Sequence, residues 1–341
     1  MKTSMMSAVL PDNPILARRT RGGAIESQHR GAWVVVDSLG AILDGDGAKR
    51  EFVFARSSTK SMQALPLIES GAAEHFGLSE VELALAISSH NAEVCHTQPV
   101  EGLLQRLGLT PADLGCGPAS PSDPETRRAL FAAGAPPSAL HHNCSGKHAG
   151  FLALALHMGV EPAAYLQPDS ASQLAVRAAM RSMCDLGEDE FAVAIDGCSA
   201  PTYRLPLDKL ATGIARVANP DDLAPERAGA CRRMTAAAAA HPELIAGHHK
   251  RLCTDLARVT GGRLFPKVGA EAVYVVGVRG ADRAYALKVD DGSTAAMNQI
   301  VVEHLFRLGF LSRNEYDELE AWHDVRLFNA AGLEVGTREV L

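Results

Sequence analysis

The sequence predicts an α+β fold, in which one antiparallel sheet is built from strands near the two ends of the chain and is flanked by helices. Two observations support this prediction. Segments rich in β-branched residues lie at 32–43 and 272–289, and the long stretch between them has mostly helical spacing of its apolar residues. Strands and helices do not alternate along the chain, which argues against a parallel βαβ sheet.

Each strand-rich segment is predicted to form a hairpin. Residues 32–37 are a β-branched run, and a turn at 38–40 leads to a second short run at 41–43. Near the other end, residues 272–278 and 284–289 are two such runs separated by a turn that contains glycine and aspartate. Distant segments therefore close one sheet.

The helices are predicted from their caps and from apolar spacing. Ser79 and Glu82 form a capping box ahead of an apolar run. A second helix is predicted to start at Ser122 and to stop at Gly134. Six more are predicted over 144–158, 169–184, 224–240, 242–259, 294–308 and 313–322. No linker, repeat or low-complexity tract interrupts the sequence, so we expect a single domain over residues 1–341.

Composition excludes several classes of protein. The chain has 341 residues, of which 47% are hydrophobic and 21% charged, which is enough for a core and excludes intrinsic disorder. No apolar stretch is long enough to span a membrane. The net charge of −7 argues against a nucleic-acid-binding protein.

The cysteines and the N-terminus favour a cytoplasmic protein. The seven cysteines are odd in number and scattered, unlike a disulfide framework. Residues 1–21 contain Pro11 and Pro14 where a signal peptide would need its apolar block. We therefore expect free thiols in a reducing compartment.

The first candidate catalytic motif pairs Ser57 with Lys60. The two residues lie three positions apart at the start of a predicted helix and so share a face. A buried lysine whose pKa is lowered can remove the proton of a serine hydroxyl, which makes the hydroxyl a nucleophile. The alternative is a capping serine followed by a solvated lysine.

Two further motifs strengthen this interpretation. Ser89 and Asn91 follow a capped helix, and Lys267 precedes Gly269 just ahead of a predicted strand. The order Ser-x-x-Lys, Ser-x-Asn, Lys-x-Gly is that of serine β-lactamases and penicillin-binding proteins. Together the motifs favour an active serine, although each alone is also consistent with a helix end or a loop.

A fourth motif contains two cysteines. Cys144 with Lys147 or His148, together with Cys198, offers thiolates and a nitrogen that suit Zn²⁺. Two buried apolar cysteines, or a Cys144–His148 nucleophile pair, are the alternatives.

The other histidines are not predicted to form sites. Cys95 and His96 lack a third ligand nearby in sequence. His248 and His249 stand beside Lys250 and Arg251 in a predicted helix, where they indicate a solvated face.

Four segments resemble a known family. Residues 56–66, 88–93, 143–150 and 196–201 are similar to the asparaginase II family, the rhizobial-type or class 3 L-asparaginases, and the resemblance covers nearly the whole chain. It implies the serine β-lactamase and glutaminase fold, hydrolysis of L-asparagine to L-aspartate and ammonia, and a homodimer.

The resemblance also implies roles for residues. Ser57 with Lys60 and Ser89 with Lys267 form two Ser–Lys tandems, and the substrate-binding candidates are Arg56, Asn91, Asp196 and Ala270. Among these, Asp196 is a candidate for binding the α-amino group, and Arg56 for binding the carboxylate or for charge balance. Apart from the resemblance, a serine mechanism would use the backbone N–H groups of Ser57 and Ala270 to hold the oxyanion. Cys144, Lys147 and Cys198 would hold one zinc ion that tunes substrate binding rather than the chemistry.

Three other functions remain open from the sequence. A glutaminase differs by one methylene in its substrate, which a pocket wall discriminates by only about 1–3 kcal/mol. A β-lactamase or peptidase shares the motif order but acts outside the cytoplasm. A zinc-dependent protein that binds amino acids without hydrolysing them is the non-catalytic alternative.

Overall fold

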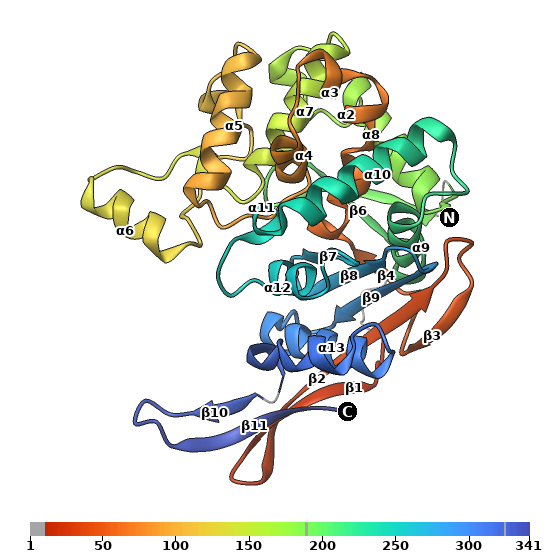
Figure 1. The fold of residues 1–341 in the computed structure, drawn as a ribbon, viewed down its shortest axis with the longest axis vertical. Helices are drawn as coiled ribbons and strands as arrows, with labels where there is room; N and C mark the ends of the chain where they lie inside the picture. The colour runs from red at the N-terminus through yellow and green to blue at the C-terminus, as the bar shows by residue number, and fades with distance from the viewer. Residues whose placement is uncertain (1–10, 188–189, 324) are drawn as a thin grey trace.

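The computed structural model describes residues 11–187, 190–323 and 325–341, and it confirms the α+β prediction. Most helices stack on one side of a long curled sheet, and a smaller helical layer lies on the other side (Figure 1). The first ten residues, on which part of the signal-peptide argument rests, lie outside the described residues.

Two antiparallel sheets organise the chain. In the large sheet the strand order is β10-β11-β1-β2-β9-β8-β7, with β3 paired to β2, and in the small sheet it is β4-β6-β5. The strands are β1 Ile15–Arg21, β2 Ala24–Val36, β3 Ile42–Asp46, β4 Phe52–Phe54, β5 Ala192–Ile195, β6 Pro201–Pro206, β7 Leu264–Gly269, β8 Val273–Val278, β9 Arg283–Val289, β10 Arg326–Phe328 and β11 Glu334–Val340. The two ends of the chain therefore share one sheet, as predicted.

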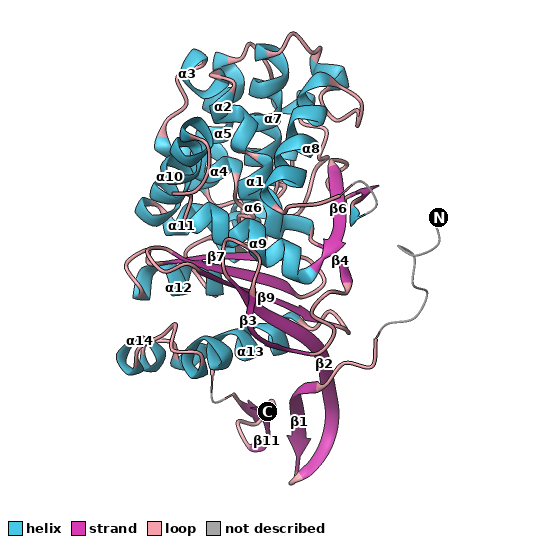
Figure 2. Cartoon of the chain, turned by 90° about the vertical axis from the view of Figure 1, so that its right-hand side faces the viewer, coloured by secondary structure: helices cyan, strands magenta, loops and turns pink. Residues whose placement is uncertain are grey.

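The central strands of the large sheet are buried on both faces. Along β8, Val273 and Val275 point into the core shared with the main helical layer, whereas Tyr274 and Val276 point into a second core. Helix α9 covers the first face and α13 the second (Figure 2). This explains the continuous apolar run in β8, because a strand covered on both sides needs no polar residues.

The main helical layer surrounds α7, which is buried from Ser145 to Ala155. The α-helices are α1 Lys60–Gln63, α2 Leu65–Glu69, α3 Ala72–His75, α4 Glu80–Ala86, α5 Val94–Arg106, α6 Pro124–Ala132, α7 Ser145–His157, α8 Ala171–Met183, α9 Leu207–Ala218, α10 Pro225–Ala240, α11 Pro242–Ala246, α12 Leu252–Val259, α13 Thr294–Arg307 and α14 Arg313–Asp317. No described helix has the length and apolar character needed to cross a membrane.

Most predicted elements are confirmed, with local differences. Both hairpins form, and Ser79 and Glu82 make the predicted capping box. Helix α6 is capped by Asp123 rather than Ser122, since the Asp123 carboxylate accepts from the Thr126 N–H. The last predicted helix ends at Asp317, and a separate 3₁₀ turn covers Glu320–Trp322.

The predicted helix over 242–259 is wrong. The chain breaks between α11 and α12, where Gly247 has φ 137° and Lys250 has φ 53°, both outside the helical region. His248 and His249 therefore lie in a loop and not on a helix face.

Helix α7 packs directly on α4 at Gly146. A Cβ atom on this residue would lie 2.3 Å from the Leu85 carbonyl oxygen, which belongs to a buried backbone. We expect Gly146→Ala to lower the free energy of unfolding by about 1–3 kcal/mol through overpacking. Urea denaturation followed by circular dichroism measures this change.

Gly102, in α5, is the matched control because a Cβ atom there meets nothing within 4 Å. Gly102→Ala should stabilise the protein by roughly 0.5–1 kcal/mol, because alanine has the higher helix propensity. Equal effects of the two substitutions would contradict the close packing of α4 and α7.

Candidate active site

The candidate site lies where four parts of the chain meet. Ser57 belongs to the 3₁₀ turn Arg56–Thr59, Lys60 begins α1, Ser89 follows α4, and Lys267 lies within β7. Gly269 allows the close approach, since a Cβ atom there would lie 2.8 Å from the Ala55 carbonyl oxygen. Lys267 thus stands within a strand of its own, β7, ahead of the predicted strand, and the alternative of a loop lysine is wrong.

One hydroxyl group links the two buried lysines. Lys60 Nζ lies 3.1 Å and Lys267 Nζ 2.8 Å from Ser89 Oγ, and both lysines are 1% exposed. Lys60 Nζ also donates to the Ser88 carbonyl oxygen and lies 3.1 Å from Cys144 Sγ. The tandem predicted for Ser89 and Lys267 therefore includes Lys60.

Burial destabilises the charged form of both lysines and so lowers their pKa values. Desolvation lowers the pKa of Lys60, although the neighbouring Cys144 acts in the opposite direction. The pKa of Lys267 lies well below its ordinary value because of burial first and the charge of Lys60 second. A neutral amine, which is what a general base requires, is thus favoured here.

Ser57 is the more accessible of the two serines. Its side chain is half-buried, whereas Ser89 is 4% exposed. Within the described residues no hydrogen bond joins Ser57 Oγ to Lys60 Nζ, so the predicted Ser57–Lys60 tandem stays a prediction. Catalytic hydrogen bonds often form only when substrate is bound.

Arg56 and Asp196 form an ion pair at the edge of the site. Arg56 Nε lies 2.8 Å and Nη2 2.7 Å from Asp196 Oδ1. A cavity of about 640 Å³ opens beside this pair, with Arg56 and Gly197 in its lining. Ser57, Lys60, Ser89 and Lys267 are not among its lining residues, so this cavity meets the candidate site only at Arg56.

The predicted zinc ligands come together. Lys147 Nζ lies 3.2 Å from Cys198 Sγ, and the thiol of Cys198 hydrogen-bonds that of Cys144, at the start of α7. That hydrogen bond holds the pKa of Cys144 well below its ordinary value and raises the pKa of Cys198. Burial acts to lower the pKa of Lys147, but the charges of Cys198 and Cys144 raise it overall, so Lys147 must lose a proton before it can bind a metal. With that proton released, two sulfur atoms and an amine are a donor set that fits Zn²⁺.

The alternative Cys144–His148 nucleophile pair finds no support. His148 Nδ1 lies 2.6 Å from the Tyr165 hydroxyl, and burial lowers the pKa of His148 well below its ordinary value. His148 therefore hydrogen-bonds Tyr165 through Nδ1, and the structure describes no hydrogen bond between His148 and the Cys144 thiol.

Asn91 and Ala270 differ in their surroundings. Asn91 is buried, and its side-chain oxygen accepts a hydrogen bond from Arg251. Ala270 is exposed in the turn that follows β7. Gly269, its neighbour, lies close to the Ser58 backbone N–H, where a Cβ atom would be 3.4 Å away. The backbone at Ala270 thus lies near the turn that carries Ser57.

Arg251 was missed by the sequence analysis. It was assigned to a solvated helix face, but Arg251 Nη2 donates to the Ser89 carbonyl oxygen at 2.7 Å. The residue therefore holds the backbone of the segment that carries Ser89. No local signal marks this role, because the contact depends on the loop between α11 and α12.

The backbone is strained beside three candidate residues. Arg56, Ala92 and Ser199 have φ values of 52°, 69° and 68°, in the left-handed region that residues with a Cβ atom rarely adopt. They adjoin Ser57, Asn91 and Cys198. Such strain concentrates at functional sites, where surrounding contacts hold it in place.

A family model described as L-asparaginase II matches residues 17–340. The chain belongs to the L-asparaginase II family. Its members are asparagine amidohydrolases, so the protein is an enzyme of that class. No curated protein sequence matches the chain.

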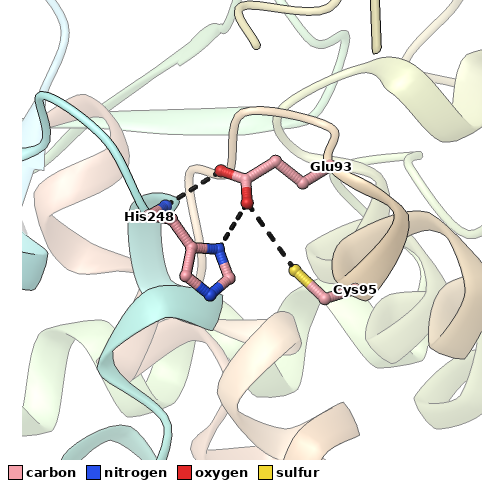
Figure 3. Close-up of side chains that lie close together, drawn as sticks. All are labelled: Glu93, Cys95 and His248. Carbon is pink, nitrogen blue, oxygen red and sulfur yellow. Dashed lines mark hydrogen bonds and ion pairs between the residues drawn. The ribbon is translucent and has the colours of Figure 1, made fainter. Parts of the chain in front are cut away.

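A second group of possible metal ligands lies outside these residues. Glu93, Cys95 and His248 place their ligand atoms within 4.8 Å of one another (Figure 3). The sequence analysis had left Cys95 without a third ligand and had placed His248 on a solvated helix face. The fold instead brings them together.

Proposed function

We propose that this L-asparaginase II family member hydrolyses L-asparagine to L-aspartate and ammonia through an ester formed on Ser57. The observation that carries the proposal is the buried arrangement of Lys60 and Lys267 around the Ser89 hydroxyl, beside an accessible second serine. We also propose one domain over residues 1–341, acting as a homodimer.

Acylation needs a base, a nucleophile and an oxyanion site. Neutral Lys60 removes the proton of Ser57, and Ser57 Oγ attacks the carbon of the side-chain carboxamide. The backbone N–H groups of Ser57 and Ala270 stabilise the negative oxygen of the tetrahedral intermediate.

The second half of the reaction uses Ser89. Its hydroxyl gives a proton to the departing ammonia and recovers one from protonated Lys60 or Lys267, both within hydrogen-bonding distance. Water then attacks the β-aspartyl ester, which releases aspartate and restores the Ser57 hydroxyl. Burial of Ser89 suits a proton relay better than a nucleophile that substrate must reach.

Lys60 is also the lysine that contacts the Cys144 group. Lys60 has three acceptors, one of them Cys144, whose low pKa favours a thiolate. A zinc ion held by Cys144, Lys147 and Cys198 would offset that thiolate charge beside the substrate and so tune substrate binding rather than the chemistry.

Substrate binding uses the Arg56–Asp196 edge. An α-amino acid carries one positive and one negative group, and the two side chains present the complementary charges. Asp196 binds the α-amino group and Arg56 the α-carboxylate, while Asn91 lies on the far side of Ser89 near Arg251. A cytoplasmic location is supported by the seven cysteines, all of which are free thiols.

Removing the nucleophile tests the mechanism. Ser57→Ala should lower the turnover number for asparagine by at least about three orders of magnitude. A coupled ammonia assay measures it, with asparagine, glutamine and a chromogenic cephalosporin compared in parallel to separate asparaginase from glutaminase and β-lactamase activity.

Ser58→Ala is the matched control for that substitution. Ser58 is the adjacent serine, but its hydroxyl is committed to the Ala55 carbonyl oxygen at 2.6 Å. The control should keep most of the activity. Near-normal ammonia release by Ser57→Ala would rule out the acyl-enzyme.

The pH dependence tests the base. A lysine must lose its proton to act, so kcat/KM should rise with pH. Since burial lowers the pKa of Lys60, the rise should be centred below its ordinary value of 10.5. Lys60→Arg, whose guanidinium keeps its proton, should abolish the rising limb together with most of the activity. A rate that falls with increasing pH over the neutral range would contradict a neutral lysine base.

Metal analysis tests the zinc proposal. Cys198→Ala should lower the zinc that copurifies with the enzyme by one equivalent and should raise KM for asparagine more than it lowers kcat. Cys184→Ala is the control, because Cys184 is buried against Met62. Mass spectrometry of the metal content that finds no zinc in the untreated protein would disprove this part of the proposal.

A further inference from the structure

Glu93, Cys95 and His248 form a ligand cluster separate from the candidate active site (Figure 3). We propose that these three side chains bind a second zinc ion that clamps the loop between α11 and α12 to the start of α5. This inference depends on contacts in the fold and not on the proposed reaction.

The spacing of the donor atoms suits one small cation. His248 Nδ1 lies 2.5 Å and Cys95 Sγ 4.0 Å from Glu93 Oε2. Ligands of a tetrahedral zinc ion lie roughly 3.3–3.8 Å from one another, given metal–ligand bonds of about 2.0–2.3 Å. Small side-chain movements therefore bring the three donors to coordinating positions.

His96 lies beside the cluster. Its Nε2 lies 3.0 Å from the Glu243 carbonyl oxygen, and a carbonyl can only accept, so the ring proton is on Nε2. The lone pair on Nδ1 is left 3.7 Å from Cys95 Sγ. His96 is therefore a neighbour of the Cys95 thiol and not one of the three ligand atoms that lie within 4.8 Å of one another.

The donor set favours zinc over magnesium or calcium. One thiol, one imidazole and one carboxylate make three protein donors and leave the fourth tetrahedral position to water, and the sulfur and nitrogen atoms select zinc rather than the hard, oxygen-preferring cations. Binding would release the thiol proton of Cys95, since the thiolate is the form that binds metal. His248 is exposed and the cluster is partly open, so an ion can enter from solvent.

The fold explains why the cluster forms. Glu93 precedes α5 and Cys95 and His96 lie in its first turn, whereas His248 comes from a loop far away in sequence. Gly247 brings that loop close, because a Cβ atom there would lie 2.7 Å from Glu93 Oε1.

A metal at this cluster would affect the region of Ser89 indirectly. The loop that carries His248 also carries Arg251, which donates to the Ser89 carbonyl oxygen and to Asn91. The three ligands are therefore positioning residues, because they would act on Ser89 only through Arg251 and its loop. The alternative is a simple Glu93–His248 ion pair that binds no metal.

Zinc binding to the full-length protein tests the proposal. After removal of metal by a chelator, equilibrium dialysis against micromolar Zn²⁺ should show one fewer bound equivalent for Cys95→Ser/His248→Ala than for the wild type. His249→Ala, an exposed histidine next in the loop, is the matched control and should bind as the wild type does.

A spectroscopic measurement separates this cluster from the Cys144 group. In a Cys144→Ser/Cys198→Ser background, Co²⁺ should still give thiolate charge-transfer and tetrahedral visible bands, and adding Cys95→Ser should abolish both. Zinc should also raise the melting temperature of the wild type more than that of Cys95→Ser/His248→Ala. Equal zinc equivalents in the wild type and this double variant would overturn the proposal, as would binding only at millimolar zinc.

Discussion

The candidate site depends on two lysines that are buried around one hydroxyl group. An ammonium ion taken from water into the protein loses its hydration, and each unit of pKa depression corresponds to about 1.4 kcal/mol. Lys60 and Lys267 are each 1% exposed, so the rest of the fold must offset that free energy. The hydrogen bonds to Ser89, and the large apolar core around α7, provide the compensation.

The position of β7 explains how a lysine enters this core. β7 is the edge strand of the large sheet and pairs only with β8, so Pro266 costs no ladder hydrogen bond in the sheet interior. Side chains alternate along a strand, which places Lys267 on the same face as Phe265, toward the helical layer. The absence of a Cβ atom at Gly269 then lets the strand end approach the turn that carries Ser57.

The parts of this structure that sequence predicts well are those set by local interactions. The two hairpins follow from β-branched runs and turn residues, and the Ser79–Glu82 capping box follows from its spacing. The predicted helix over 242–259 fails because Gly247 and Lys250 adopt positive φ values that loop contacts impose. Strands such as β11 escape notice because their exposed faces carry polar residues in no clear pattern.

In the candidate site too, the features set by local sequence could be predicted and those set by contacts between distant segments could not. The residue types Ser57, Lys60 and Lys267 could be selected from motif order, and the cysteines of the Cys144 group from their chemistry. The hydrogen bond from Lys60 to Ser89 could not be predicted, because it joins residues on different elements. Arg251 and His248 belong to a loop whose course depends on packing against the segment after α4, and the sequence contains no sign of that contact.

The short segment from Ser89 to His96 takes part in both the lysine site and the cluster of Glu93, Cys95 and His248. Its backbone is fixed at Ala92, where φ is 69° and the N–H donates to His90 Nδ1, and His90 Nε2 is held in turn by Ser145 Oγ at 2.9 Å. On one side of this turn Ser89 meets the lysines, and on the other Glu93 meets His248. Arg251 spans the turn, so a movement of its loop would withdraw the donor from the Ser89 carbonyl oxygen without touching either lysine. The same loop therefore contacts both the backbone of Ser89 and the cluster of Glu93, Cys95 and His248.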